Sequence, residues 1–178
     1  VDNQDPGVHE SRVNGLNSSG VGVGEVSHLR MDGSGYDHFA FRWDELSGMV
    51  RLDDLGYTWL DLETGLPVTG WIAGGANEIN DAGQIVGYAR NDSSESGSRA
   101  FFFDSGTGFY LLPRAPGAPE GPQTAAVLDE NGNVLIKLIT EVSCVLFWSP
   151  LNSATTTLVF QGGDFSNVNS RMIGDFFF

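Results

Sequence analysis

The sequence predicts an all-β fold, organised as a propeller-like array of about three and a half antiparallel β-modules. Glycine and proline are the first reason, because 24 and 7 of them among 178 residues leave few windows for a helix of three turns. Second, short β-branched or aromatic segments recur between turn-forming residues. Third, these segments repeat in a fixed order, as in propellers and solenoids. We expect a single repeat domain over residues 1–178.

Each predicted module joins a hairpin to an aromatic strand and a closing strand. The clearest copy reads ANEINDAGQIVGYA, RAFFFD and GFYLLP within residues 76–113. Four turn residues align in successive copies: Asn17, Asn80, Asp129 and Asn169. The modules are predicted at residues 12–75, 76–121, 122–160 and, as an incomplete copy with a first hairpin only, 165–178.

In the first three modules the aligned positions carry Asn or Asp followed by Gly, because a tight hairpin turn favours residues of these types. An Asn or Asp such as Asn80 or Asp129 can cap its own backbone, and the glycine that follows takes a positive φ at little cost. We therefore predict tight turns around Gly20, Gly83 and Gly132. These turns should connect antiparallel strands at equivalent positions of successive sheets.

The third strand of each module carries aromatic residues on both faces. The three segments are FAFRW at 39–43, AFFF at 100–103 and VLFW at 145–148. Strands that are buried on both sides are expected where sheets stack face to face, as propeller blades do. The aromatic strands therefore predict that the modules stack on one another.

The first module is longer than the others. Its extra segment, residues 57–75, contains Trp59, Trp71 and the turn Glu63-Thr64-Gly65. We expect this segment to form an added hairpin or a long connection between modules.

The segment HFAFRWDELSGMVRLDDLG at 38–56, and ANEINDAGQIVGYA followed by RAFFFD, resemble the extracellular HAF-repeat family. That family's repeat joins an IN-D-x-G-x-V-V-G hairpin to an H-A-F-hydrophobic-W strand and a G-x-hydrophobic-x-D-L-G strand. The resemblance covers most of residues 12–104, weakens towards 160 and returns briefly at the end. The second module has Arg99 where the family often has His, and the third has lost the pattern at Ser143-Cys144-Val145. The resemblance implies a bacterial secreted protein of propeller-like fold, with no catalytic residues in the repeat.

The composition limits which partners and which cellular location we expect for the protein. A formal net charge of −14 argues against nucleic acid and against anionic membrane surfaces, since both need a basic footprint. No run approaches the roughly 20 apolar residues of a membrane helix, so we expect no membrane insertion. One lysine, Lys137, together with abundant Gly, Ser, Asn, Asp and Thr, favours an extracellular or periplasmic protein whose leader has been removed. The single cysteine, Cys144, excludes an intrachain disulfide.

The motifs of common enzymes and cofactor sites, GxSxG, Walker A, HExxH, CxxC and GxGxxG, are absent from the sequence. We expect no catalytic residues and no cofactor that folding requires. The sharpest metal candidate is a calcium site formed by Asp32, Ser34 and Asp37 in a glycine-rich loop. The alternative for this loop, which we favour, is an ordinary polar turn between strands.

Two rival functions rest on particular side chains. Tyr57, Trp59 and Trp71 could form an aromatic carbohydrate platform, which would make the protein a lectin-like propeller, although packing in the core is favoured for these rings. The acid pairs Asp53/Asp54 and Asp61/Glu63 could serve an acidic-site glycoside hydrolase, the least favoured interpretation.

The incomplete fourth module predicts an interaction site. Its hairpin ends at Phe176, Phe177 and Phe178 with no third strand to follow, and folded proteins pair or cover such edges. We expect this edge to be completed by a protein partner or by self-assembly through strand addition. The predicted function is a non-catalytic extracellular structural or interaction repeat protein within a larger assembly.

Overall fold

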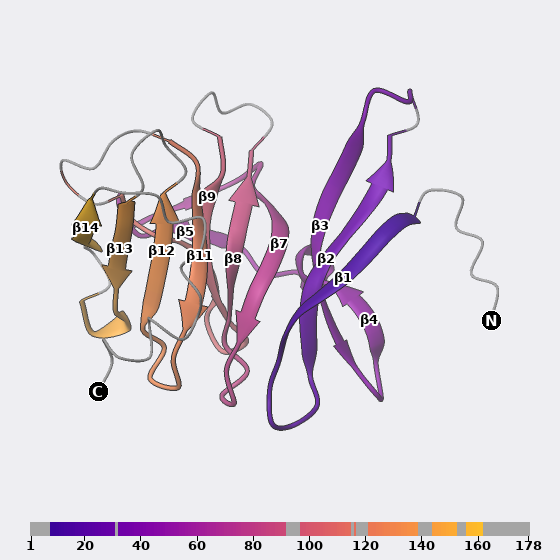
Figure 1. Ribbon diagram of the computed structural model, residues 1–178, viewed down its shortest axis with the longest axis horizontal. Helices are drawn as coiled ribbons and strands as arrows, with labels where there is room; N and C mark the ends of the chain where they lie inside the picture. The colour runs from indigo at the N-terminus through magenta and orange to yellow at the C-terminus, as the bar shows by residue number, and fades with distance from the viewer. Residues whose placement is uncertain are drawn as a thin grey trace.

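The computed structural model describes residues 8–30, 32–91, 97–114, 116, 121–138, 144–152 and 156–161. These residues form an all-β structure of three sheets, with two short 3-10 turns at Leu52–Leu55 (η1) and Pro150–Asn152 (η2). Figure 1 shows the sheets side by side in chain order, and none of them is closed on itself. In the part of the chain that the structure describes, no helix is long and apolar enough to cross a membrane.

The three sheets share one antiparallel meander, which we call a module. The first module contains β1 (Val8–Leu16), β2 (Gly22–Leu29), β3 (Tyr36–Asp44) and β4 (Gly48–Arg51). The second contains β7 (Ile72–Ile79), β8 (Ile85–Arg90), β9 (Arg99–Asp104) and β10 (Gly108–Leu111). The third contains β11 (Gln123–Leu128), β12 (Val134–Leu138), β13 (Cys144–Trp148) and β14 (Thr156–Gln161).

The predicted hairpin turns are confirmed. They connect β1 to β2, β7 to β8 and β11 to β12, and each pair is antiparallel. Gly20, Gly83 and Gly132 all have φ near +80°, at 79°, 79° and 81°. Each turn is closed by a hydrogen bond in which the glycine N–H donates to the carbonyl of Asn17, Asn80 or Asp129.

The extra segment predicted within the first module, residues 57–75, contains a hairpin, which is one of the two structures expected for it. Strands β5 (Trp59–Asp61) and β6 (Leu66–Val68) pair with each other, and β5 adds to β10 in parallel. The hairpin therefore belongs to the second sheet, whose order is β6-β5-β10-β9-β8-β7. The structure thus differs from the predicted boundary at residue 75, because pairing with β10 places residues 59–68 beside the second module.

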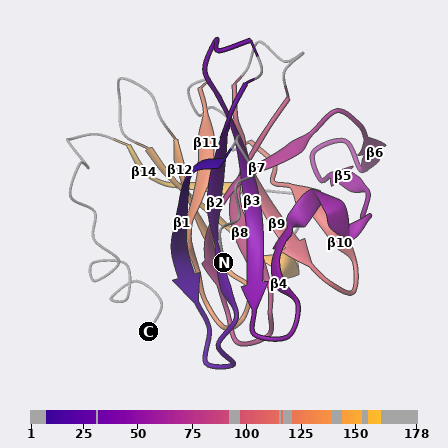
Figure 2. The same cartoon turned by 90° about the vertical axis from the view of Figure 1, so that its right-hand side faces the viewer.

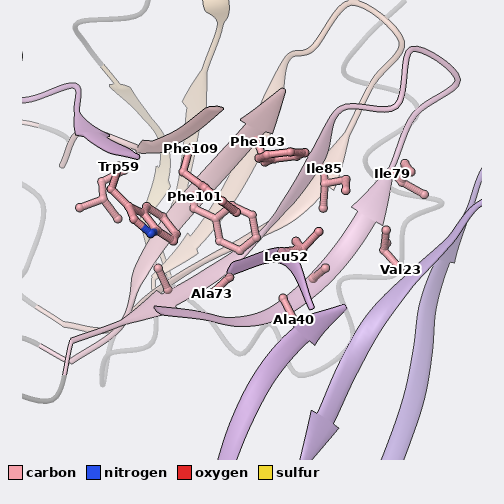
Figure 3. Packing of buried hydrophobic residues seen from close by; sticks show 13 residues of the cluster. Val23, Ala40, Leu52, Trp59, Ala73, Ile79, Ile85, Phe101, Phe103 and Phe109 are labelled. Carbon is pink, nitrogen blue, oxygen red and sulfur yellow. The ribbon is translucent and has the colours of Figure 1, made fainter. Parts of the chain in front are cut away.

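The sheets pack face to face, as the aromatic strands predicted. One face of β9 contributes Phe101 and Phe103 to a core shared with Val23 and Ala40 of the first sheet (Figure 3). The other face contributes Phe102 to a core shared with the third sheet. That second core also contains Val86, Ala100, Leu112, Ala125, Leu128, Val134, Ile136, Leu146 and Trp148. Both faces of the second module are therefore buried by its neighbours.

Candidate functional site

The residue that begins each hairpin turn caps its own backbone. Asn17 Oδ1 accepts hydrogen bonds from the backbone N–H groups of Ser19 and Val21, at 3.1 and 3.0 Å. Asn80 Oδ1 accepts in the same way from Gln84 at 2.9 Å. Local capping of this kind needs only an oxygen, so both Asn and Asp serve at this position.

The same asparagines also bind the next module along the chain. Asn17 Nδ2 donates to the main-chain carbonyl of Asn80 at 3.2 Å, and Asn80 Nδ2 donates to the carbonyl of Asp129 at 3.0 Å. An amide side chain carries a donor and an acceptor, and so it can cap one turn and bind another at once. Successive turns are chained together by their equivalent residues.

A β-bulge supplies a second repeated contact. The pairing of β1 with β2 shifts between Val13 and Gly15, which leaves Asn14 as an extra residue, and a shift between Ala76 and Glu78 does the same for Asn77 in β7. Asn14 Nδ2 donates to the carbonyl of Ala76 at 2.8 Å. Asn77 Nδ2 donates to the carbonyl of Ala125 at 2.7 Å. Bulges commonly re-aim a side chain, and here both bulges aim an amide at the following sheet.

A third contact completes what we call the inter-module ladder, the set of hydrogen bonds from residues 14, 17 and 18 to the second module and from 77, 80 and 81 to the third. The backbone N–H of Ser18 donates to Asp81 Oδ1 at 2.8 Å, and that of Asp81 donates to Glu130 Oε2 at 3.0 Å. The hydrogen bond from the Ser18 backbone holds the pKa of Asp81 below its ordinary value. The ladder therefore joins both neighbouring pairs of modules in the same way.

The two side-chain donors of the ladder have no counterparts in the third module. Ala126 is the extra residue of the β11 bulge, and its methyl group cannot donate a hydrogen bond. Asp129 caps its turn by accepting from the backbone of Asn131 and Asn133, but its carboxylate has no N–H. The side chains of this module that match Asn77 and Asn80 thus cannot hold a further sheet in the same manner.

Each of the later modules receives its predecessor on the same face. In the second module this receiving face consists of two rows across the sheet, and its side chains belong to the core shared with the first sheet. The rows are Ile79, Ile85, Phe103 and Phe109, and Ala76, Gly87, Phe101 and Leu111. The matching rows of the third module contain Leu128, Val134 and Trp148, and Ala125, Ile136 and Leu146.

The matching face of the first module is exposed in part, because several of its apolar side chains are open to solvent while Phe41 is only 1 % exposed. Its rows are Leu16, Gly22, Trp43 and Met49, and Val13, Gly24, Phe41 and Arg51. Figure 2 looks towards this face. The side chains of Val13, Leu16, Trp43 and Met49 are between 42 % and 66 % exposed. Grouped apolar side chains that are exposed to this extent mark an interaction surface.

A polar cleft of about 340 Å³ lies between the first two sheets, beside the ladder residues Asn14 and Asn77. On its wall Glu25 Oε1 lies 2.6 Å from His38 Nδ1, and the hydroxyl of Tyr88 donates to Glu25 Oε2 at 3.0 Å. Burial and the neighbouring Glu25 carboxylate raise the pKa of Tyr88. The Glu25 carboxylate thus has polar partners from both sheets, His38 in the first and Tyr88 in the second, and we assign these side chains a role in packing the sheets together.

The loop proposed for calcium forms a polar turn. Asp32 Oδ1 accepts from the backbone N–H of Ser34 at 2.9 Å, and this bond lowers the pKa of Asp32. Asp37 Oδ1 accepts from Arg30 Nε at 3.0 Å and lies 3.3 Å from a guanidinium nitrogen of Arg90. No group of three or more His, Cys, Asp or Glu with metal-binding geometry occurs among the described residues. Because two arginines already compensate Asp37, the contacts favour the turn over a calcium site.

The aromatic platform is not formed as a common exposed surface. Trp59 is only 6 % exposed and stacks on Phe109, with ring centroids 4.4 Å apart. Tyr57 is partly exposed, but its hydroxyl donates to the carbonyl of Ser105, and Trp71 packs against the first core. A carbohydrate platform needs rings that a sugar can reach, and the buried Trp59 cannot supply one.

In each acid pair proposed for hydrolysis, one carboxylate forms hydrogen bonds or an ion pair that hold the fold together. Both carboxylate oxygens of Asp53 accept from the backbone N–H of Ala73, at 3.2 Å each, and burial raises the pKa of Asp53. Asp61 forms a two-point ion pair with Arg99, at 2.9 and 3.1 Å. Burial alone would raise the pKa of Asp61, but the hydrogen bonds from Arg99 and from the Glu63 backbone outweigh it and lower the pKa.

The predicted edge residues Phe176, Phe177 and Phe178 lie outside the described residues. The sequence did contain a signal for the ladder that the hairpin alignment left unused: Asn14 and Asn77 occupy the same place, three residues before Asn17 and Asn80. No protein-family model matches this chain, and no curated protein matches it.

Proposed function

We propose that this chain is a non-catalytic repeat protein whose modules, arranged like propeller blades, serve structure or interaction within a larger assembly. One observation carries the proposal: a row of side chains that is buried in the second module is exposed in the first, at Leu16, Trp43 and Met49. An exposed apolar row at positions that pack against a neighbouring sheet elsewhere in the chain is suited to a further β-module. The interaction would use the same apolar rows and hydrogen bonds that join the described sheets.

An extracellular or periplasmic location is part of this proposal. Its support is the composition, with a single lysine and a net charge of −14, and the resemblance to HAF repeats in the first two modules. The absence of enzyme motifs from the sequence and the structural engagement of Asp53 and Asp61 support a non-catalytic role.

A carbohydrate-binding role is the second candidate, and one cleft favours it. This cleft of about 340 Å³ lies between the second and third sheets, where the partly exposed Tyr110 lines it together with the polar side chains Gln84 and Asp104. Aromatic faces beside hydrogen-bonding groups suit a sugar ring. A glycan array tests this candidate, with Tyr110→Ala as the variant that should lose any retention.

Matched substitutions at Leu16 and Ile79 test the proposed function. The two residues are equivalent, but Leu16 is exposed whereas Ile79 is buried beneath the first sheet. Leu16→Glu should change the free energy of unfolding by no more than about 0.5 kcal/mol, whereas Ile79→Glu should cost about 3 kcal/mol or more. Denaturant unfolding measures both.

Equal destabilisation by the two substitutions would show that the chain covers the face itself, and it would contradict the proposal. The proposal also requires that the protein release no reducing sugar from a panel of polysaccharides. Release of reducing sugar would point instead to the hydrolase, and retention on the glycan array would point to the lectin.

A further inference from the structure

We propose that the cleft between the second and third sheets binds an arginine side chain of a protein partner, and that Asp104 is the carboxylate that holds its guanidinium group. This inference goes beyond the proposed function, because it gives a ligand chemistry to a site away from the exposed row of the first module. A sugar is the other candidate ligand for this cleft, and the two ligands differ in charge.

The first module shows how an acid at this position of the repeat is used. Asp44 and Asp104 both end the aromatic strand of their module, in the same register with the closing strand. Oδ1 of Asp44 caps the turn that follows by accepting from the backbone N–H of Leu46 at 3.0 Å. Oδ1 of Asp104 accepts in the same way from Gly106 at 2.8 Å. The other oxygen of Asp44, Oδ2, lies 3.2 Å from a guanidinium nitrogen of Arg42, so the first module compensates this carboxylate with its own arginine.

The second module has a different residue at the place of that arginine. The match for Arg42 is Phe102, two residues before Asp104, and its ring is buried in the core shared with the third sheet. Oδ2 of Asp104 accepts from the side-chain amide of Gln84 at 3.2 Å, and no Lys, Arg or His among the described residues forms an ion pair with it. A charged donor binds a carboxylate roughly twice as strongly as a neutral one. Asp104 thus presents a negative charge to the cleft that a ligand cation can compensate.

The other walls of the cleft suit the body of an arginine side chain. The cleft has a volume of about 340 Å³, and Leu62, Pro150 and Tyr110 line it together with Asp104. The ring of Tyr110 is partly exposed. An aromatic face attracts a guanidinium group, and the methylene stem of arginine packs on apolar surface. One carboxylate among such walls fits this side chain better than a calcium ion, which takes six to eight oxygen ligands.

The charge of the chain favours a basic partner, and its own contacts favour arginine over lysine. A net charge of −14 attracts a partner that carries exposed cations. Within the fold, the guanidinium carbon of Arg51 lies 3.6 Å from the centroid of the Phe39 ring, and Arg42 pairs with Asp44. A planar guanidinium group can stack on a ring and bind a carboxylate at the same site, whereas the ammonium group of lysine acts as a point charge. We therefore assign arginine.

Titration of the full chain with two short peptides, followed by NMR, tests the proposal. The acetylated and amidated peptides Gly-Arg-Gly and Gly-citrulline-Gly have side chains of nearly the same shape, but citrulline is uncharged. The arginine peptide should shift the resonances of Gln84 and Tyr110 with a Kd on the order of 1 mM. The citrulline peptide should bind at least about tenfold more weakly, because it lacks the charge that Asp104 recognises.

Substitutions at the two equivalent acids separate the cleft from the general charge of the surface. Asp104→Asn retains an oxygen for the turn and should weaken binding of the arginine peptide at least about tenfold. Asp44→Asn makes the same change in net charge outside the cleft, and it should bind the peptide like the unaltered chain. Asp104→Ser provides an independent test, because the third module has Ser149 at this position, where its Oγ accepts from the backbone N–H of Leu151 at 3.4 Å. Circular dichroism checks that all variants are folded.

Three results would overturn the proposal. Equal binding of the two peptides would show that charge plays no part, and equal losses for Asp104→Asn and Asp44→Asn would reduce the effect to general attraction by an acidic surface. Retention of a glycan that Tyr110→Ala abolishes and the arginine peptide does not displace would assign the cleft to a sugar. The first two results would leave the interaction role of the exposed first-module row standing, because the substitutions at Leu16 and Ile79 test that role separately.

Discussion

The side-chain amide of Asn17 donates to the main-chain carbonyl of Asn80, and Asn80 donates in turn to the carbonyl of Asp129. Asn80 thus accepts from the module before it and donates to the module after it, while its oxygen caps its own turn. A change from Asn to Asp preserves the cap and removes the donor. Asp129 therefore keeps a hairpin turn but lacks the side-chain donor that Asn17 and Asn80 supply.

Removal of the bulge amide should weaken the contact between the second and third modules. Asn77→Ala removes the donor to the Ala125 carbonyl and to Thr124 Oγ1, and it reproduces the alanine that the third module has at this position. Since a partly buried carbonyl loses its partner, we expect a loss of about 1–3 kcal/mol in the free energy of unfolding. Urea unfolding measures it.

Asn131→Ala provides the matched control for this loss. Asn131 lies in an exposed turn, where its backbone rather than its side chain makes the hydrogen bond to Asp129. Its replacement should change stability by less than about 0.5 kcal/mol. Equal effects of the two substitutions would mean that the bulge amide contributes nothing to the interface.

Two glycines in the second strands should resist any larger residue. At Gly87 an added Cβ would overlap the carbonyl of Gly75 on the paired strand, and at Gly24 it would overlap the carbonyl of Arg12. Gly87→Ala therefore forces β7 and β8 apart, at a cost of about 3 kcal/mol. Thermal unfolding followed by circular dichroism checks this expectation.

Substitution of the turn glycine Gly83 separates the effect of steric overlap from the effect of backbone strain. A Cβ at Gly83 meets no atom within 4 Å, but the residue has φ +79°, so Gly83→Ala carries only the cost of a left-handed conformation. That cost is about 1–2 kcal/mol. A larger loss for Gly83→Ala than for Gly87→Ala would contradict the steric argument.

The repeat and its stacking could be predicted from the sequence because both have local signals. The Asn or Asp followed by Gly marks each hairpin, and the run Phe101-Phe102-Phe103 needs a sheet on either side. The place of the β5–β6 hairpin could not be predicted in this way. Its sheet is decided by parallel pairing of Trp59–Asp61 with β10, a long-range contact that local sequence does not encode.

The candidate site was predicted less completely than the fold. The first module's aromatic strand gave no sign that Trp43 is exposed, because this strand carries aromatic residues as does the one that is buried on both sides. The role of Asn14 depends on a bulge, and a bulge is a property of the paired register. The loop at Asp32 contains a turn, and whether it binds calcium stays a prediction; the contact of Asp37 with Arg90 could not be predicted, because the two residues are far apart in the sequence.

Removal of divalent metal should leave the protein unchanged. Because Asp37 is compensated by Arg30 and Arg90, and Asp32 caps its own turn, the loop should not depend on calcium. The thermal unfolding midpoint should be the same in EDTA and in calcium. The metal site would be established instead if calcium raised the unfolding midpoint of the unaltered protein but not that of the Asp32→Asn variant.

The ion pair between Arg99 and Asp61 should dominate the effect of acid on stability. Hydrogen bonds from Arg99 lower the pKa of Asp61 in the folded protein, so the ionised form is favoured by folding. The stability that this provides is present above the ordinary aspartate pKa of about 4, and it is lost as the pH falls through the lower folded value. Asp61→Asn should flatten the dependence of unfolding free energy on pH in this acidic range.

Substitution of the two partners separately and together tests the same pair at neutral pH. Arg99 is 7 % exposed and also donates to the carbonyl of Leu112, so Arg99→Met leaves Asp61 without its compensating charge in a buried place. We expect a loss of about 3–5 kcal/mol. Adding Asp61→Leu to Arg99→Met should recover part of this loss, because no charge then remains buried. If the double variant is instead less stable than Arg99→Met, the uncompensated carboxylate is not the source of the loss, and the contacts of the Arg99 side chain with the Trp71 ring and the Leu112 carbonyl must account for it.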